Sequence, residues 1–501
     1  MSAFGDLREA LGEISDLSSA VALLWWDERT KMPPAGAADR AEHSATLVRV
    51  IHQRLASDHL GELLDRARGE VDGHEDGDEA AVIRVAIREW EKARRVPVEL
   101  RAEIARAESI SEHAWLEARA NADFAVMRPH LERLVDLKRR YIECFEVAHP
   151  YDALLDDFEP EANTAMVGDI LERLRAGLTP LVEQVAAREP LDDSCLHADF
   201  PVERQRRFAA DLLLSLPLPQ GGWRLDDTAH PFAESISVTD IRLTTRYDPA
   251  FLGTAVWAVI HEAGHGLYEA GMPAALARTS AGRPRSLGLH ESQSRLWENW
   301  IGRSRAYMTA LLPLLREHFP ERFTGIEPAD LYGAANVVRR SLIRVEADEL
   351  TYNLHIAIRF ELEVELFEGR LRVEELPEAW NARYADYLRL AVPDDGVGVL
   401  QDVHWAGGSF GYFSTYSLGN VIAAQLWRRA RAELPDLDAE LAAGELEPLY
   451  AWLARTLFPH AGKYSAAETV RRALGEAIDP APLLAHLEAK YGELYGLEGA
   501  S

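Results

Sequence analysis

The sequence is poor in cysteine. Only Cys144 and Cys195 occur among its 501 residues. Two thiols cannot form a framework of disulfides or a four-thiolate metal site. This scarcity argues against a small disulfide-stabilised scaffold and is compatible with a reducing compartment. We therefore expect a cytoplasmic protein.

Long hydrophobic runs are also missing. The longest apolar run covers about seven residues, 20–26, whereas a helix needs ~20 to span a bilayer. The first 17 residues carry four acidic side chains. They have neither a basic start nor a continuous apolar stretch, so they do not resemble a secretory signal. These absences predict a soluble, intracellular protein that does not act at a membrane.

Basic residues are the minority among the charges. Lysine and arginine number 54 against 82 aspartates and glutamates, so the formal net charge is −28. Such a chain repels phosphates, and we expect no nucleic-acid partner. Hydrophobic residues reach 47% and charged residues 27%, which is typical of a globular protein. Length alone suggests roughly three domains of ~150 residues.

Most of the chain has helical periodicity. Apolar residues recur at spacings of three and four over 3–25, as in an amphipathic helix. The same pattern predicts helices over 38–69, 78–95, 98–120, 124–147, 163–188 and 201–215, then over about 250–270, 290–317, 328–370, 373–388 and 414–434, and onward to the C-terminus. Residues 223–247 instead alternate and are rich in β-branched side chains. This stretch predicts a small antiparallel sheet of two or three strands within a helical protein.

The acidic stretch Asp72–Asp78 has some likeness to a calcium-binding loop. Its twelfth position is Ile83, where such a loop requires a bidentate glutamate. We therefore interpret the stretch as an acidic surface turn.

A metal-binding pattern occurs at His261-Glu-Ala-Gly-His265. The two histidines are four residues apart, so on a helix their imidazoles point about 40° apart and face the same point. Glu262 lies beside them and can reach a metal-bound water, as in the His-Glu-x-x-His motif of zinc metallopeptidases. The alternative is a surface pair of histidines with a helical glutamate.

Zinc needs a third protein ligand and one open position. Glu291 follows His261 by 30 residues and opens a predicted helix, so a helix hairpin would bring its carboxylate to the imidazoles. His290 competes, but adjacent residues on a helix point about 100° apart, so only one of the two can bind. Glu298 lies two turns further on. It either orients a ligand imidazole or is an ordinary solvated charge.

Five motifs together resemble the carboxypeptidase Taq family of metallocarboxypeptidases. They are His261–His265, His290–Gln293, Asp240-x-Arg242-x-Thr244, Ile343–Asp348 and Gly398–Trp405. All five occur in the family's order, and the resemblance covers essentially the whole chain.

The resemblance implies a mainly α fold. We expect a helical saddle with a deep active-site groove and the small antiparallel sheet beside it, similar to neurolysin and angiotensin-converting enzyme. The motifs must converge on one groove, so the prior of three domains gives way to a single domain over 1–501. Its N-terminal helical part would cover 1–216, and the sheet with the catalytic helices 217–501.

The resemblance also implies an activity. The family removes single residues from the C-termini of peptides with broad specificity and little tolerance of C-terminal proline. Its members use Zn²⁺, which Co²⁺ sometimes replaces, and commonly form homodimers. In this sequence His261, His265 and Glu291 would hold the metal. Glu262 would act as general base and then return a proton to the leaving amine.

Donors for the tetrahedral oxyanion are expected from the glycine-rich stretch 407–416 and its neighbour His404. Tyr416 is the first candidate and Tyr412 the second, since both carry phenolic O–H groups. His404 would donate to the scissile carbonyl or to a substrate amide. Core packing is the alternative for each tyrosine, and a structural histidine with satisfied hydrogen bonds is the alternative for His404.

An exopeptidase must also bind the free carboxylate of its substrate. Arg344 is the first candidate because a guanidinium pairs with two oxygens, and the resemblance puts its motif at the closed end of the groove, with Gln401 and His404 nearby. The alternative is a helical ion pair with Glu346 or Asp348. Arg242 is a weaker substrate-binding candidate, since Asp240-x-Arg242-x-Thr244 places three polar side chains on one strand face and favours a supporting network.

Two further hypotheses compete with the carboxypeptidase. One is an oligoendopeptidase or dipeptidyl carboxypeptidase on the same scaffold, which would release longer fragments. The other is a non-catalytic helical peptide-binding protein with a vestigial metal site. The intact Glu262 argues against the latter, because a structural zinc site needs no base.

The strand at 234–238 is expected to pair with the peptide backbone, which gives affinity without reading side chains.

Overall fold

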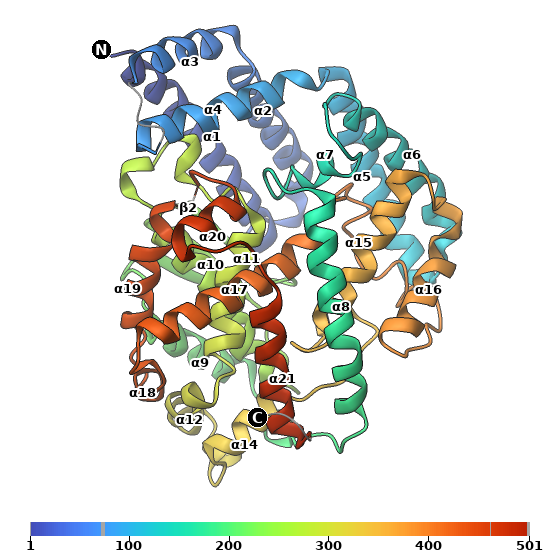
Figure 1. The fold of residues 1–501 in the computed structure, drawn as a ribbon, viewed down its shortest axis with the longest axis vertical. Coiled ribbons are helices and arrows are strands. Elements are labelled where there is room, and N and C mark those ends of the chain that lie inside the picture. Colours follow the sequence, from blue (N-terminus) through green and yellow to red (C-terminus); the bar gives the residue numbers. More distant parts are fainter. Residues whose placement is uncertain (1, 72–75, 461, 498–501) are drawn as a thin grey trace.

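The chain is built almost entirely from helices. The computed structural model describes residues 2–71, 76–460 and 462–497 (Figure 1). The mainly α fold predicted from the sequence is confirmed. The predicted acidic turn at Asp72–Asp78 lies in part outside the described residues. Among the described helices, none is both long and apolar enough to cross a membrane.

The first half of the chain contains nine helices in the described residues. They are α1 (Ala3–Thr30), α2 (Ala37–Leu55), α3 (Asp58–Glu70), α4 (Asp78–Arg95), α5 (Val98–Asn121), α6 (Phe124–Ile142), α7 (Asp152–Leu155), α8 (Thr164–Ala186) and α9 (Val202–Leu214). The predicted helix over 38–69 is two helices, α2 and α3. The reason is Ser57, whose hydroxyl accepts a hydrogen bond from the Leu60 N–H and starts α3 afresh.

Twelve described helices follow the sheet. They are α10 (Gly253–Ala270), α11 (Leu287–Arg295), α12 (Arg305–His318), α13 (Pro320–Phe323), α14 (Pro328–Ala335), α15 (Tyr352–Glu368), α16 (Leu376–Tyr387), α17 (Ser414–Glu433), α18 (Leu437–Ala443), α19 (Glu447–Thr456), α20 (Ala466–Leu474) and α21 (Ala481–Tyr495). A π-helical segment, Leu296–Ile301, directly continues α11.

The prediction of one helix over 328–370 is wrong. Residues 336–351 leave the helical path and include a 3₁₀ turn at Arg344–Glu346. Two polar side chains account for the break by bonding to the backbone in place of helix hydrogen bonds. The Asn336 amide donates to the carbonyls of Tyr332 and Arg303. The Asp348 carboxylate accepts from the N–H groups of 339, 350 and 351.

The sheet has three strands in the order β1–β3–β2. The strands are β1 (Trp223–Asp227), β2 (Ala233–Ser237) and β3 (Asp240–Thr245). β2 and β3 form an antiparallel pair, but β3 lies between the other two strands and runs parallel to β1. The prediction of an antiparallel sheet is therefore wrong for β1 and β3. Alternation along a strand reports which face is buried, and it carries no information on the neighbour's direction.

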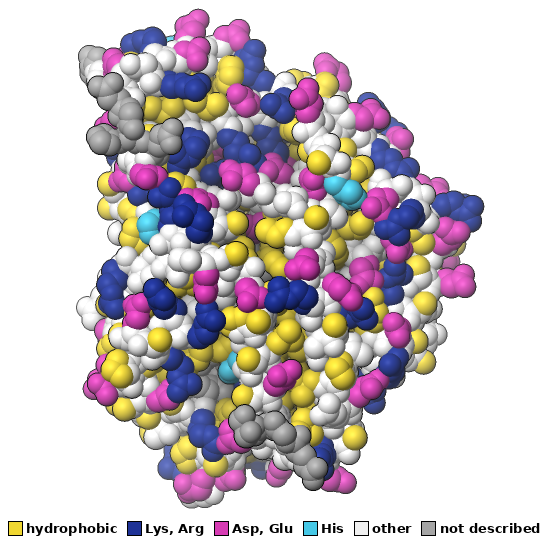
Figure 2. Space-filling view, in the orientation of Figure 1, with side chains coloured by type: hydrophobic (Ala, Val, Ile, Leu, Met, Phe, Trp, Pro, Cys, Tyr) yellow, Lys and Arg dark blue, Asp and Glu magenta, His cyan; other side chains and the backbone are white. Residues whose placement is uncertain are grey.

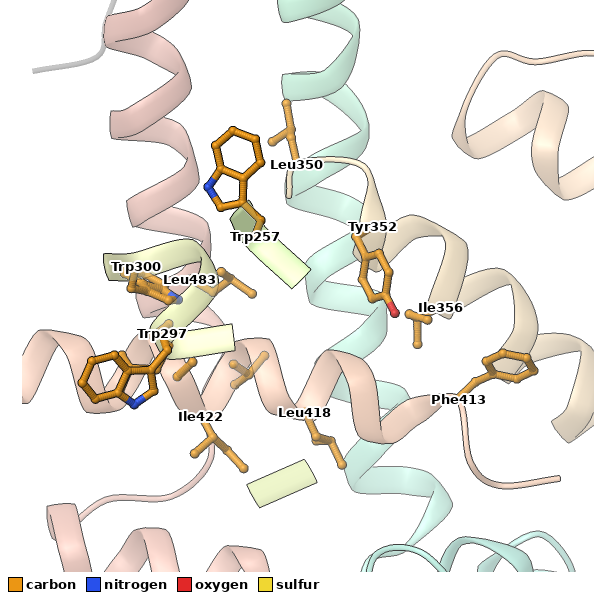
Figure 3. Packing of buried hydrophobic residues seen from close by; sticks show 14 of the residues in the cluster. Trp257, Trp297, Trp300, Leu350, Tyr352, Ile356, Phe413, Leu418, Ile422 and Leu483 are labelled. Atoms are coloured by element: carbon orange, nitrogen blue, oxygen red, sulfur yellow. The ribbon is translucent and has the colours of Figure 1, made fainter. Parts of the chain in front are cut away.

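The main hydrophobic core runs through both halves of the chain. It includes Leu131 and Leu174 from the first half and Trp257, Trp297 and Leu418 from the second. Figure 3 shows part of this core around Trp257, Trp297 and Trp300, close to Leu418 and Ile422 of α17. A smaller core lies under the N-terminal helices and joins α1, α3 and α4 to the loop after α10.

α11 lies in contact with both α10 and α17. On its α10 side, Gly264 allows the backbones to touch, because a Cβ there would lie 2.7 Å from the Ser294 Cα. On its α17 side, a Cβ at Gly419 would lie 2.6 Å from the Cγ of Glu291. Two glycines therefore set how closely the three helices that carry the site approach one another.

Candidate metal centre and active site

The His-Glu-x-x-His residues lie on α10, as predicted. One face of α10 is buried through Val256, Val259 and Ile260, and Gly266 packs closely on Ile241 of β3. The opposite side carries His261 and His265, whose side chains remain 18% and 13% exposed. The helix is therefore anchored on the sheet and the core while both imidazoles stay accessible.

Glu291 of α11 completes a cluster with the two imidazoles. The ligand atoms of the three side chains all lie within 4.8 Å of one another. Glu291 Oε2 is 3.9 Å from Nε2 of His261 and 3.6 Å from Nε2 of His265. Two imidazole nitrogens and one carboxylate oxygen are a donor set that suits a catalytic zinc ion, with a position left for water. The cluster thus fits a divalent metal by its chemistry and its spacing.

Glu298 supports this cluster from behind. Its Oε2 lies 2.9 Å from His261 Nδ1, so the imidazole turns Nε2 toward Glu291. Burial would raise the pKa of Glu298, but the His261 hydrogen bond and the charges of Arg295 and Arg303 hold it well below its usual range. Of the two interpretations that the sequence left open, the geometry favours the orienting carboxylate. Glu298 lies in the π-helical segment 296–301, which places its carboxylate next to His261.

Glu262 is a buried carboxyl group beside the cluster. Its side chain is buried against the rest of the protein, and only 6% of the residue is exposed. Burial raises its pKa to about 7. A carboxyl group poised near neutral pH is suited to accept and return a proton.

His290 does not join the three ligands. Its Nε2 lies 2.7 Å from Glu269 Oε1, and its ring stacks on His265 with centroids 4.4 Å apart. The competing ligand considered from the sequence therefore turns away and supports the His265 ring instead.

The fold and the site match a known group of peptidases. A family model described as "Carboxypeptidase Taq (M32) metallopeptidase" matches residues 6–491. The chain belongs to the carboxypeptidase Taq (M32) family. The protein is therefore a metallocarboxypeptidase, which confirms the resemblance and the enzyme class predicted from the five motifs.

Individual relatives agree with this assignment to the M32 family. The chain is 42% identical to thermostable carboxypeptidase 1 of Thermus thermophilus, with 99% of each protein covered. It is 39% identical to carboxypeptidase 1 of Bacillus subtilis, with 97% of each covered. The crystal structure of an M32 carboxypeptidase from Deinococcus radiodurans R1 has a TM-score of 0.96 at 39% identity, covering 99% of this chain and 100% of that one.

His404, Tyr412 and Tyr416 lie together, although a loop separates the first from the other two. The Tyr416 hydroxyl is 3.4 Å from His404 Nε2, and the Tyr412 and Tyr416 rings are 5.3 Å apart. Tyr416 belongs to α17, one turn before Gly419, which touches Glu291. Burial lowers the pKa of His404 to about 4 and raises the pKa of both tyrosines. At neutral pH the imidazole is uncharged and both phenols are protonated.

Arg344 is buried in the 3₁₀ turn before α15, with 4% of the residue exposed. Its Nε and Nη2 donate to Asp402 Oδ1 at 3.0 and 2.7 Å, and its Nη1 donates to the Tyr352 hydroxyl at 3.0 Å. The alternative considered from the sequence, an ion pair with Glu346 or Asp348, is not formed, and Arg344 pairs with Asp402 instead. The physical reason is that the segment is not helical, and Asp348 is occupied by backbone N–H groups.

Gln401 and a second arginine complete this arrangement. Gln401 Oε1 accepts from the Arg344 backbone N–H at 2.9 Å and from Arg359 Nη2 at 2.8 Å. Arg359 is fully buried and also pairs with Asp402, 2.6 Å from Nη2 to Oδ2. Sequence reasoning missed Arg359, Asp402 and Tyr352. An arginine within the otherwise apolar stretch 356–360 of α15 was the available signal for Arg359.

The contacts of Arg242 are within the sheet and to the helix that packs against it. Its Nε and Nη2 donate to Asp240 at 2.5 and 2.9 Å, and its guanidinium lies over the Trp26 ring of α1 at 4.6 Å. Thr244 exchanges hydrogen bonds with the Phe232 backbone. These contacts join β3 to α1 and to the start of β2, in keeping with a supporting network.

Proposed function

We propose that the protein releases single amino acids from the C-termini of peptides, with Zn²⁺ held by His261, His265 and Glu291. The observation that carries the proposal is the convergence of two imidazole nitrogens and one carboxylate oxygen within 4.8 Å, next to Glu262. A divalent metal in such a donor set lowers the pKa of water and polarises a carbonyl oxygen. Glu262 then takes the proton of the attacking water and gives one to the leaving amine.

Tyr416 and Tyr412 would donate hydrogen bonds to the oxyanion of the tetrahedral intermediate. Support comes from their raised pKa values and their position beside Gly419 and Glu291, since both phenols keep their protons at neutral pH. The neutral His404 would donate to the scissile carbonyl or to a substrate amide.

Arg344 would receive the free carboxylate of the substrate. Gln401 is retained only as a weaker substrate-binding candidate, since its Nε2 already donates to the carbonyl oxygens of Leu342 and Val397 and its Oε1 accepts from the Arg344 backbone. Among the described residues, three of the five N–H groups of Arg344 have partners, so two donors remain. Arg344 and Arg359 share the one carboxylate of Asp402, which leaves a local charge of +1. Arg242 is retained only as a weaker substrate-binding candidate, since its contacts are to Asp240 and to Trp26. The edge strand β2 would pair with the peptide backbone, which gives broad specificity.

We also propose that Co²⁺ can replace Zn²⁺, that the protein acts in the cytoplasm as a homodimer, and that residues 1–501 form a single domain. The two cysteines are free thiols, which suits a reducing compartment. The main core draws residues from both 1–216 and 217–501, which supports one domain. The homodimer rests on the family resemblance alone.

The experiment compares wild type with Glu262→Gln on N-blocked dipeptides and on the same peptides amidated at the C-terminus. Wild type should release single amino acids only from the free carboxylates. The Glu262→Gln variant should still bind the metal, and its kcat should fall by about 10²- to 10⁴-fold. Equal cleavage of amidated peptides would overturn the exopeptidase assignment. On a longer N-blocked peptide, released products longer than one residue would favour a dipeptidyl carboxypeptidase or an oligoendopeptidase. Binding of the peptide without any hydrolysis would favour a peptide-binding protein.

A further inference from the structure

Arg295 lies between the two carboxylates that organise the candidate metal centre. It is the last residue of α11, one turn after Glu291 and three residues before Glu298. Its Nε donates to Glu291 Oε1 at 2.6 Å, and its Nη1 donates to Glu298 Oε2 at 3.2 Å. Only 14% of its side chain is exposed. One guanidinium therefore bonds both the carboxylate that faces the imidazoles and the carboxylate that orients His261.

The two oxygens of Glu291 have different surroundings. Oε1 is taken by Arg295, whereas Oε2 lies 3.6 and 3.9 Å from the Nε2 atoms of His265 and His261. Arg295 thus holds one oxygen away from the cluster and leaves the other facing it. The contact to Glu298 Oε2 ties the same guanidinium to the oxygen that pairs with His261 Nδ1.

Arg295 is itself held in place by Tyr352 at the start of α15. Its guanidinium lies over the Tyr352 ring at 4.6 Å from the centroid. Tyr352 is buried in the core (Figure 3), and its hydroxyl accepts from Arg344 Nη1 at 3.0 Å. The side chain of Arg295 is therefore fixed by a ring on one side and by two carboxylates on the other.

We propose that Arg295 is a positioning residue that presents a single oxygen of Glu291 to the metal and keeps Glu298 on His261. This inference rests on the proposed ligand set His261, His265 and Glu291. Lysine keeps the charge but offers a point donor on a flexible stem in place of a planar fork, so it cannot hold both carboxylates at these positions.

The test is Zn²⁺ affinity, measured by competition with a chelator, for wild type and Arg295→Lys. We expect the dissociation constant to rise about 10- to 100-fold. At saturating Co²⁺ the visible absorption should change, because a freed Glu291 alters the coordination of the metal. The kcat should fall more than the KM rises. The matched control is Arg383→Lys, since Arg383 also bridges two glutamates, Glu361 and Glu365, with 17% of its side chain exposed.

Tyr352 provides a second pair of variants, which keeps the test decisive if Arg295→Lys does not fold. Tyr352→Leu removes the ring under Arg295 without touching either carboxylate and should weaken Zn²⁺ binding about threefold to tenfold. Tyr352→Phe keeps the ring and should leave the affinity unchanged. Equal affinities for Tyr352→Leu and Tyr352→Phe would contradict the proposal.

Failure of the inference is distinguishable from failure of the ligand set. Glu291→Gln should lose Zn²⁺ binding if the ligand set is right. Loss of binding in Glu291→Gln together with wild-type affinity and Co²⁺ absorption in Arg295→Lys would overturn the role of Arg295 alone. Wild-type binding by Glu291→Gln would overturn the ligand set on which the role depends.

Discussion

Glu159 is a buried carboxyl group at the start of the helix that carries Glu291. Only 1% of the residue is exposed, and its Oε2 accepts from the Gly288 N–H at 2.9 Å. Burial raises its pKa to about 7. The side chain therefore holds the first turn of α11 by accepting this hydrogen bond, while its burial makes the ionised form costly in the folded state.

The pKa of Glu159 predicts a pH dependence of stability. Since the folded-state pKa is raised, the folded chain binds this proton more tightly than the unfolded chain. Stability is then lost as pH rises from about 4.5 to about 7. Glu159→Gln cannot ionise and keeps an acceptor for Gly288. In urea denaturation, its free energy of unfolding should equal that of wild type at pH 4.5. At pH 8 its free energy of unfolding should be higher than that of wild type by up to about 3 kcal/mol.

The control for this prediction is Glu117→Gln, because Glu117 is exposed on α5. It should change stability little and equally at both pH values. A Glu159→Gln effect that is the same at pH 4.5 and pH 8 would show that the charge of Glu159 is not the cause.

At the scale of elements, the metal centre depends on how α11 sits between α10 and α17. α10 supplies the two imidazoles, α11 supplies the Glu291 carboxylate, and α17 carries Tyr416. Their backbones approach closely at Gly264 and Gly419. A shift of α11 by a fraction of an ångström would move Glu291 relative to both histidines, so helix packing and metal affinity are coupled.

Gly264→Ala should therefore lower metal affinity as well as stability. Its Cβ would lie 2.7 Å from the Ser294 Cα and 2.8 Å from the Gln293 carbonyl oxygen, and backbone cannot rotate away. We expect a loss of about 1–3 kcal/mol in unfolding free energy and at least a tenfold weaker Zn²⁺ affinity, measured by chemical denaturation and chelator competition.

Gly333→Ala in α14 is the matched control, since a Cβ there meets nothing within 4 Å. It should leave metal binding unchanged and stabilise the chain by about 0.4–1 kcal/mol through the unfolded state. Gly264→Ala with wild-type metal affinity would mean that α11 and α10 tolerate a wider separation than their packing indicates.

At the scale of the whole molecule, the negative charge is spread over a mixed surface. Acidic and basic side chains are interspersed on the face seen in Figure 2. Exposed pairs such as Arg278 with Asp16 contribute little to stability. The buried cations Arg295, Arg344 and Arg359 instead gather beside the metal centre and its neighbouring motifs. In a chain with a net charge of −28, Arg344 and Arg359 share the single carboxylate of Asp402, and the proposed binding of a substrate carboxylate depends on this local excess of positive charge.

Metal removal should lower the thermal stability of the entire chain. The proposed ligands join α10 to α11, and these helices pack into the main core, so a bound ion stabilises the folded state as a whole. At a free Zn²⁺ concentration 1,000 times its dissociation constant, the gain is about 4 kcal/mol. Chelation should lower the Tm, measured by calorimetry, by roughly 4 °C. Added Zn²⁺ should restore the original Tm.

Glu291→Gln separates the metal from general effects of the chelator. Its Tm should respond to neither chelator nor Zn²⁺. A wild-type Tm that is the same with and without Zn²⁺ would argue against a metal held between α10 and α11.

Much of the site could be read from the sequence because its parts are local. Helical periodicity and the four-residue spacing of His261 and His265 depend only on neighbouring residues. Five motifs in order were enough to identify the family, and with it the mainly α fold. The break between 336 and 351 was less visible, because Asn336 and Asp348 stop a helix through hydrogen bonds that no periodicity records.

The helical class, the metal motif and the chemistry that its residue types allow therefore follow from local sequence. Tertiary structure alone decided the parallel pairing of β1 with β3, the choice of Asp402 as the partner of Arg344, and the bridge that Arg295 makes between Glu291 and Glu298. The first two depend on contacts between residues far apart in the chain. The third depends on the π-helical turn after α11, which contains Glu298, and on Tyr352 of α15, whose ring packs against the guanidinium of Arg295.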